Sequence, residues 1–197
     1  SLPAISIVGA ASDEENREKR VILDPLLLKA NGGEWPFSGP QEIGDCASMA
    51  FGIAIELDQA AQIDDGADIQ FRPVYRPWLY SGGRVRNGKI QLRGDGSVPA
   101  WIVDHAETRG VLWADTPGLR PYNGQDAKEW GSKPPPEEFA DEAAQYTVEG
   151  FAAVRSAQEA CNAVNAGYPV AFGSMRFGTT SIKILNGRNV ARDTTDW

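Results

Sequence analysis

The sequence predicts an α+β fold, because its apolar residues follow a helical period in the first half and a strand pattern in the tail. Residues 46–63 and 98–108 have helical spacing, whereas residues 182–191 have the pattern and central turn of a β-hairpin. Strands and helices do not alternate along the chain, which argues against a parallel sheet built of β-α-β units. The 197 residues suffice for one domain with a sizeable core, or for two lobes that share an interface.

Composition and charge exclude several classes of protein. The net charge is −8 and the 19 lysines and arginines are scattered, so we expect neither a nucleic-acid partner nor contact with an anionic membrane surface. No apolar run approaches the roughly 20 residues that span a bilayer. The N-terminus lacks the pattern of a signal peptide, and a content of only two cysteines, Cys46 and Cys161, suits a reducing compartment.

The first half of the chain contains the longest predicted element. Residues 1–40 form an N-terminal segment that we expect to be mostly irregular, apart from a short strand at residues 5–8. The helix at residues 46–63 is apolar nearly all round, which indicates a buried helix. Asp45 stands where an N-cap residue is expected, and the turn at residues 64–66 would end the helix.

The region between this helix and the next is rich in proline and glycine. Pro73 and Pro77 argue against a long regular element before Trp78. Residues 94–97, Gly-Asp-Gly-Ser, predict a tight turn, and the second helix follows at residues 98–108.

The last third begins its regular structure at a capping box. Ser156 and Glu159 have the spacing of such a box and open a third helix, in which Cys161 lies at core spacing and is predicted to pack. Residues 168–173 predict a buried strand, and the β-hairpin follows it.

Cys46 is the residue with the clearest chemical use. In the first turn of a buried helix it lies in the positive field of the helix N-terminus, which favours the thiolate, and the thiolate is the nucleophile. Gln41, on the loop that enters the helix, can direct its amide N–H groups to the same place, where they and the Cys46 N–H would stabilise an oxyanion. Gly44 would let a substrate approach the backbone closely. The alternative is that Cys46 is a small apolar residue packed within the helix.

Around Cys46 the chain has the grouping Gln-x-x-Gly-x-Cys-x-Ser. It resembles the papain-like cysteine peptidases, in which a Gln precedes a nucleophilic Cys at the start of a central helix. It is more closely similar to the peptidase-like proteins of that fold in tailed bacteriophages and related bacterial genomes. The likeness runs from about residue 41 to the C-terminus and includes residues 127–131. Its three main motifs are Gly44-Asp45-Cys46, Gly94-Asp95-Gly96-Ser97 and Gly167-Tyr168-Pro169-Val170.

The resemblance implies a papain-like fold with two lobes. Residues 41–119 would form the helical lobe, with Cys46 at the start of its central helix. Residues 120–197 would form a β-rich lobe that also uses residues 1–40 and is incomplete, because its C-terminal strands are missing.

The resemblance also implies roles for individual residues. Cys46 would be the nucleophile, Gln41 the oxyanion donor, and Gly44 a part of the substrate cleft. The glycine-rich turn would line the same cleft with Gly94, Asp95, Gly96 and Ser97. An equal alternative is that this turn caps the following helix, with Ser97 as its N-cap. We expect a peptide or protein substrate and neither a metal ion nor another cofactor.

The sequence departs from the family in its histidines. The catalytic His usually follows the Cys by roughly 130–150 residues, which corresponds to about positions 176–196 here, and that window holds no His. The single histidine, His105, is predicted to be a surface or half-buried helix residue. We therefore expect the catalytic His to lie beyond Trp197, and the chain as given to be inactive.

Three functions remain open at this point. The first is a cysteine-peptidase-like protein whose thiol hydrolyses an amide. The second is a catalytically silent structural component of a bacteriophage virion on the same scaffold, with other virion proteins as partners. The third is a peptide-binding module that uses the turn at residues 94–97. The first two place the protein in a bacterial cytoplasm or in a virion.

Overall fold

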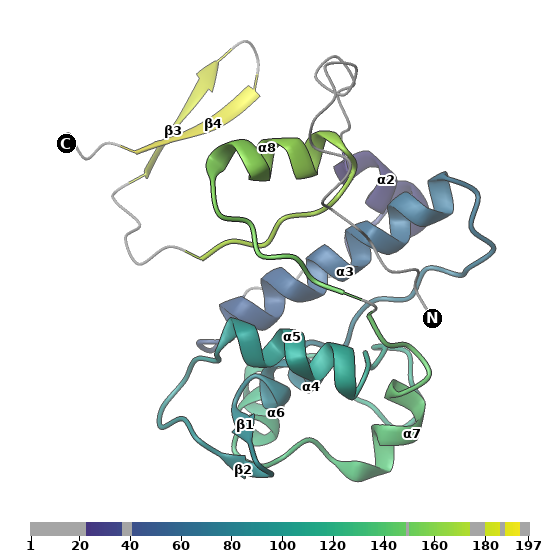
Figure 1. Cartoon of the computed structure of the whole chain (residues 1–197), viewed down its shortest axis with the longest axis vertical. Coiled ribbons are helices and arrows are strands. Elements are labelled where there is room, and N and C mark those ends of the chain that lie inside the picture. The colour runs from purple at the N-terminus through teal and green to yellow at the C-terminus, as the bar shows by residue number, and fades with distance from the viewer. Residues whose placement is uncertain (1–22, 37–40, 149, 174–179, 186–187, 194–197) are drawn as a thin grey trace.

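A long helix, α3 (Cys46–Asp64), runs through the middle of the molecule in the computed structural model (Figure 1). The structure describes residues 23–36, 41–148, 150–173, 180–185 and 188–193. On one side of α3 lie most of the other helices and a small hairpin; on its other side lie α2, α8 and a second hairpin. The described residues therefore form a mixed structure of helices with small antiparallel sheets, which agrees with the predicted α+β class at this coarse level. The other elements are α2 (Leu23–Ala30), α4 (Arg76–Gly82), β1 (Val85–Arg86), β2 (Lys89–Ile90), α5 (Pro99–Thr108), α6 (Gly124–Trp130), η1 (Glu137–Phe139), α7 (Ala140–Ala143), α8 (Ala157–Asn165), β3 (Thr180–Leu185) and β4 (Arg188–Asp193).

Helix α3 has the predicted bounds within one residue, but its surroundings differ from the prediction in two ways. The Asp45 side chain does not cap the helix, since it accepts no hydrogen bond from the first turn. The helix is also only partly buried, since Ile53 is 39% exposed, and one of its fully buried side chains is the charged Glu56.

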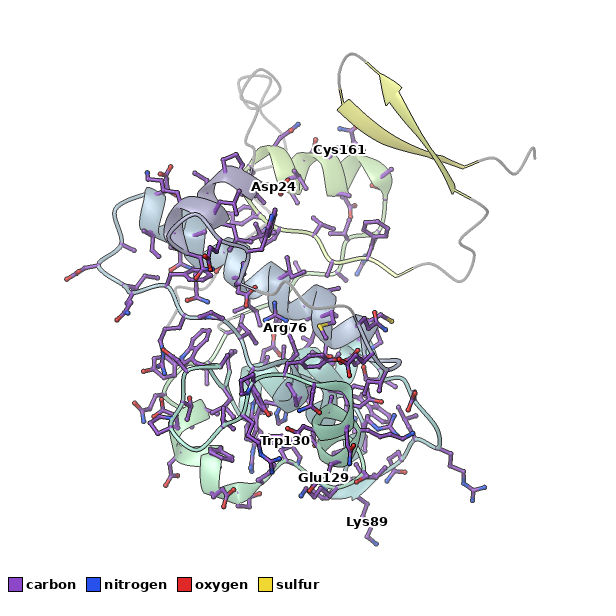
Figure 2. All side chains as sticks on the ribbon, turned by 180° about the vertical axis from the view of Figure 1, so that it is seen from behind. Asp24, Arg76, Lys89, Glu129, Trp130 and Cys161 are labelled. Atoms are coloured by element: carbon purple, nitrogen blue, oxygen red, sulfur yellow. The ribbon has the colours of Figure 1, made fainter. Side chains whose placement is uncertain are left out.

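Glu56 is buried because Arg76 of α4 neutralises it. The two groups form a bidentate pair, with Arg76 Nη1 at 2.6 Å from Oε1 and Nη2 at 2.7 Å from Oε2. The Val74 backbone N–H donates to the same carboxylate at 2.7 Å. Figure 2 places Arg76 in the middle of the molecule, among closely packed side chains. Because each charge has its counter-charge and hydrogen bonds, α3 and α4 can pack with both groups out of water.

Helix α4 is the most buried element, since all seven of its residues are buried. It begins at Arg76, two residues before the point that the prolines suggested, because Pro77 stands in the first turn, where the missing N–H leaves no helical bond unmade. Helix α4 also contributes to the apolar core. The buried members of this core are Ile55, Val74, Tyr75, Trp78, Leu79, Ile102, Ala106, Val111, Leu112, Trp113 and Ala143.

Helix α5 matches the predicted second helix, but its N-cap is Val98 and no side chain caps it. The alternative in which Ser97 is the N-cap is therefore wrong. The helix ends before Gly110, which has a φ of +80° and lies so close to α7 that a Cβ there would stand 1.9 Å from the Ala143 carbonyl oxygen. Only glycine fits this contact.

Residues 120–148 pack with the helices that precede them. Helix α6 lies against α4, and a Cβ at Gly131 would stand 2.3 Å from the Tyr80 ring. Backbone bonds join Val111 N–H to Tyr146 O at 3.0 Å and Val148 N–H to Ala106 O at 3.4 Å. We call residues 41–148 the helical body. The predicted lobe boundary at 119–120 and the two-lobe arrangement stay predictions.

Residues 150–173, which we call the outer segment, contain the predicted third helix. Ser156 Oγ accepts from the Glu159 N–H at 3.1 Å, and the Glu159 carboxylate accepts from the Arg155 N–H at 2.7 Å. Two predictions for the outer segment are wrong. Cys161 is exposed, not packed, and residues 168–173 form no strand, with Phe172 81% exposed.

The predicted hairpin at residues 182–191 is confirmed as strands β3 and β4, which pair antiparallel from Thr180↔Asp193 to Leu185↔Arg188. Its turn at residues 186–187 and the strand predicted at residues 5–8 lie outside the described residues.

Candidate active site at the start of helix α3

Cys46 is an exposed free cysteine at the first position of α3. The alternative in which this residue is packed as a small apolar group is therefore wrong. Its thiol is open to solvent, while the helix behind it is fixed by buried residues such as Met49 and Ile55. An accessible sulfur on a rigid support is what a nucleophile requires.

The loop before Cys46 contacts the glycine-rich turn, as the predicted site requires. A Cβ built at Gly44 would stand 2.7 Å from Asp95 Cβ and 3.3 Å from the Gly96 nitrogen. Two of the predicted site segments, far apart in the sequence, are thus in contact beside the start of α3. A side chain at position 44 would overlap the chain's own turn, which is a reason for glycine there. The predicted approach of a substrate to this backbone stays a prediction.

Arg84 holds the glycine-rich turn in place. Its guanidinium donates to the carbonyl oxygens of Leu92 at 3.1 Å, of Gly94 at 2.7 Å and of Gly96. It also donates to Gly131 O at 2.7 Å, which joins the turn to the end of α6. Arg84 is only 5% exposed. This role of Arg84 cannot be recognised in the sequence, because its partners are backbone carbonyl oxygens that the sequence does not mark.

The Asp45 residue, one position before Cys46, is fully buried. Tyr122 Oη donates to its Oδ2 at 2.8 Å, and its Oδ1 has no hydrogen-bond partner among the described residues. Burial raises the pKa of Asp45; the Tyr122 hydrogen bond opposes this shift, and the negative charge of Asp95 adds to it. Burial and the bond to Asp45 also raise the pKa of Tyr122.

A second tie joins the same loop to α6. Glu42 Oε2 accepts from the Gly124 N–H at 2.8 Å. The entrance to α3 is thus held at two points by the segment at residues 122–124. Neither tie can be derived from the sequence, since each joins residues about 80 positions apart.

Gln41 is exposed, and its Nε2 donates to the Ile43 carbonyl oxygen at 2.6 Å. The bond keeps the side chain on the loop that enters α3. No hydrogen bond between Gln41 and Cys46 is present in the described structure. Its role as oxyanion donor therefore stays a prediction.

His105 is buried, which corrects the prediction of a surface or half-buried residue. Its ring packs at 4.9 Å, centroid to centroid, from Trp78, and a Cβ at Gly82 would overlap it. Burial and the positive charge of Arg109 together lower the pKa of His105 to about 4, and the charge of Asp104 opposes this shift. Its Nε2 has no hydrogen-bond partner among the described residues. The group is neutral at pH 7 and faces the core, not Cys46.

An apolar groove of about 1000 Å³ lies further along α3. It is lined by Phe51, Ala54 and Ile55 of α3, by residues at the start of α5 and by much of the outer segment. Neither Cys46 nor the glycine-rich turn lines this groove.

The described residues contain neither a cluster suited to a metal ion nor a helix suited to a membrane. No group of three or more His, Cys, Asp or Glu side chains among them is arranged to hold a metal ion. None of the helices described is both long and apolar enough to span a bilayer.

Comparison with known proteins gives one structural likeness. No protein-family model matches the chain, and no curated protein sequence matches it significantly. Among solved structures, the chain is similar to xylellain, a cysteine protease from Xylella fastidiosa, at 17% sequence identity and a TM-score of 0.47. The match covers 66% of this chain and 52% of the xylellain chain, so it spans about half of that protein's length.

Proposed function

We propose that this chain is a cysteine-peptidase-like protein on a papain-like scaffold, with Cys46 as the nucleophile. The observation that carries the proposal is the exposed thiol at the first position of α3, with the glycine-rich turn packed beside it. The motif resemblance around Gly44-Asp45-Cys46 supports the same assignment.

The chemistry is attack on an amide carbonyl of a peptide or protein. The Cys46 thiolate forms a bond to the carbonyl carbon, and the carbonyl electron pair moves to the oxygen. The Cys46 backbone N–H has no partner within the helix and can donate to this oxyanion. Gln41 Nε2 has a second hydrogen besides the one given to Ile43, and we assign it to the same oxygen. Collapse expels the amine, which takes a proton, and water then releases the acyl group from sulfur.

The proposal places the general base outside residues 1–197. His105 does not serve, because it is neutral, buried and turned to Trp78. A histidine from a longer form of the chain or from a partner would accept the thiol proton and give it to the leaving amine. Without it, the residues present hold the nucleophile and the oxyanion donors but lack proton transfer.

The proposal is tested with a peptide-based, thiol-directed electrophile on the full-length protein. We expect Cys46 to be labelled at least tenfold faster than Cys161, which is a matched control because it is also an exposed free cysteine at a helix. Cys46→Ala should abolish the fast labelling, and Cys161→Ser should leave it unchanged. Mass spectrometry of the labelled peptides gives both rates.

Equal labelling of the two cysteines would contradict the proposal. It would favour the alternative of a catalytically silent scaffold, for which a bacteriophage particle is the proposed setting. That alternative has its own test, since it requires the chain to be present at fixed stoichiometry in purified particles.

A further inference from the structure

The apolar groove along α3 is separate from the candidate active site. It has a volume of about 1000 Å³ and is lined by parts of α3, the start of α5 and the outer segment. Hollows of this size are typical of sites that enclose a small organic ligand. Asp58, which belongs to the lining, lies about 18 Å along α3 from Cys46. A ligand held at Asp58 would therefore bind away from the candidate nucleophile.

Aromatic side chains form a large part of the lining. Phe51 of α3 contributes one ring, and the outer segment contributes Phe151, Tyr168 and Phe172. Phe172 is 81% exposed, so an apolar ligand that covers this ring removes its surface from water. The faces of aromatic rings also attract cations. The rings thus suit a ligand that has an apolar body and carries a positive charge.

The lining also contains a carboxyl group without a counter-charge. Asp58 is partly buried, and its Oδ2 accepts from Gln62 Nε2 at 2.7 Å. It forms no ion pair with another described residue. Burial raises the pKa of Asp58, and the hydrogen bond from Gln62 opposes this shift. A ligand that brings a positive charge to this carboxylate therefore gains more than a neutral ligand of the same shape.

Arg155 is the other charged residue of the lining among the described residues, and it would favour an anionic ligand instead. It is exposed, and the Glu159 carboxylate lies 2.7 Å from its backbone nitrogen. Water and this neighbouring negative charge both weaken the attraction of Arg155 for an anion. The more buried charge is that of Asp58, and the net charge of −8 acts in the same direction. The electrostatics of the groove thus favour a cation.

We propose that the apolar groove binds a small hydrophobic cation, in which an ammonium group is attached to an apolar body. The apolar body lies against the aromatic rings of the lining, and the ammonium group lies at Asp58. The carboxylate supplies the counter-charge, and ring faces that reach the ammonium group add cation–π attraction. The site is independent of the proposed function, because Cys46 and Gln41 are not part of its lining.

Isothermal titration calorimetry at pH 8 tests the proposal with three probes that share a decyl chain and differ in the head group. Decyltrimethylammonium is cationic, decanol is neutral and decanoate is anionic, and each is used below the concentration at which it forms micelles. We expect the cation to bind about five to ten times more tightly than decanol, and decanoate to bind more weakly than decanol. The series uses the unchanged chain, so it does not depend on the folding of a variant.

Two variants locate the charge. Asp58→Asn removes the carboxylate and keeps an oxygen that can accept from Gln62, so the preference for the cation over decanol should disappear. Asp58→Ser takes its place if Asp58→Asn does not fold. Asp64→Asn is the matched control, because Asp64 is on the same helix, is not part of the lining, and its loss changes the net charge by the same amount. It should leave the preference unchanged.

A third variant locates the apolar body. Ala54→Phe adds a ring to the part of the lining that α3 contributes, so it should weaken the binding of both the cation and decanol by at least about fivefold. Binding that Ala54→Phe leaves unchanged would place the ligand elsewhere and overturn the inference.

Three other results would also overturn it. If the unchanged chain binds none of the probes, or binds decanol as tightly as the cation, the groove does not select a positive charge. If decanoate binds most tightly, Arg155 and not Asp58 holds the head group. If Asp64→Asn reduces the preference as much as Asp58→Asn does, the cation responds to the net charge of the protein and not to a site.

Discussion

The helical body and the outer segment differ in how they are held together. In the helical body, buried side chains from α3, α4, α5 and α7 form one continuous core. In the outer segment, Ala163 is the one buried residue among residues 150–173. Figure 2 shows the same contrast, with Arg76 and Trp130 in the densely packed part of the molecule and Cys161 on α8 apart from it.

The difference shows where the candidate site gets its rigidity. Every tie that holds the entrance to α3 lies within the helical body: the Tyr122 bond to Asp45, the Gly124 bond to Glu42 and the Arg84 bonds to the glycine-rich turn. The outer segment supplies none of these ties. It contacts the helical body mainly along the apolar groove, where Phe151 packs edge-on against Phe51 at 5.6 Å. The site can therefore form without the outer segment being firmly docked.

The largest effect should come from the ion pair at the centre of the helical body. Glu56→Gln keeps the size of the side chain but removes the charge that forms the bidentate pair with Arg76, and the two side chains are 0% and 2% exposed. We expect the free energy of unfolding to fall by about 3–5 kcal/mol. Denaturant unfolding followed by tryptophan fluorescence measures it.

A matched control is the ion pair between Lys29 and Asp64, whose side chains are 75% and 41% exposed. Asp64→Asn likewise removes a negative charge while keeping the size of the side chain, but from a solvated pair, so it should cost less than about 1 kcal/mol. Equal losses in the two variants would mean that the core of the helical body does not depend on its central pair.

The second effect is a loss of stability in acid that depends on His105. Its pKa is about 4 in the folded state, against about 6.5 in an unfolded chain, so the unfolded state binds the proton first as the pH falls. The stabilisation is complete above pH 6.5 and is lost as the pH falls toward 4. It amounts to about 3 kcal/mol over that window.

The measurement compares the parent with His105→Phe, which keeps an aromatic ring beside Trp78. Only the difference in pH dependence between the two proteins matters, because the other titrating groups are common to both. The variant should lose about 3 kcal/mol less than the parent between pH 7 and pH 4. Parallel curves would show that His105 does not stay neutral in the core.

Features that depend on nearby residues could be predicted from the sequence, and features that depend on distant partners could not. Helix α3, the start of α8 and the β3–β4 hairpin follow from local periodicity, the Ser156 cap and a turn. The place of Cys46 in the first turn of a helix could also be predicted, but its exposure could not, since Ser48 in the same turn is fully buried.

The predictions that are wrong share a physical cause, because each depends on whether a partner from a distant part of the chain is present. Asp45 looks like an N-cap in the sequence, but it bonds instead to Tyr122, 77 positions away. His105 looks exposed in its own helix and is covered by Trp78 from α4. The apolar run at residues 168–173 has strand composition, but a strand needs a neighbour for its backbone bonds, and no strand pairs with it among the described residues.

The smallest effect gives the sharpest comparison, because the same capping bond occurs in both regions. Asn123 Oδ1 accepts from the Asp126 N–H at 2.8 Å at the start of α6, and Ser156 Oγ accepts from the Glu159 N–H at 3.1 Å at the start of α8. Each cap is worth about 1 kcal/mol to its own helix.

Whether that loss reaches the whole molecule depends on how the helix is packed. Helix α6 lies against α4, so Asn123→Ala should lower the free energy of global unfolding by about 1 kcal/mol. Helix α8 has one buried residue, so Ser156→Ala should speed amide hydrogen exchange within α8 by about fivefold and leave global unfolding unchanged. If Ser156→Ala lowers global stability as much as Asn123→Ala does, the outer segment unfolds together with the helical body, and the contrast between the two regions is one of exposure and not of stability.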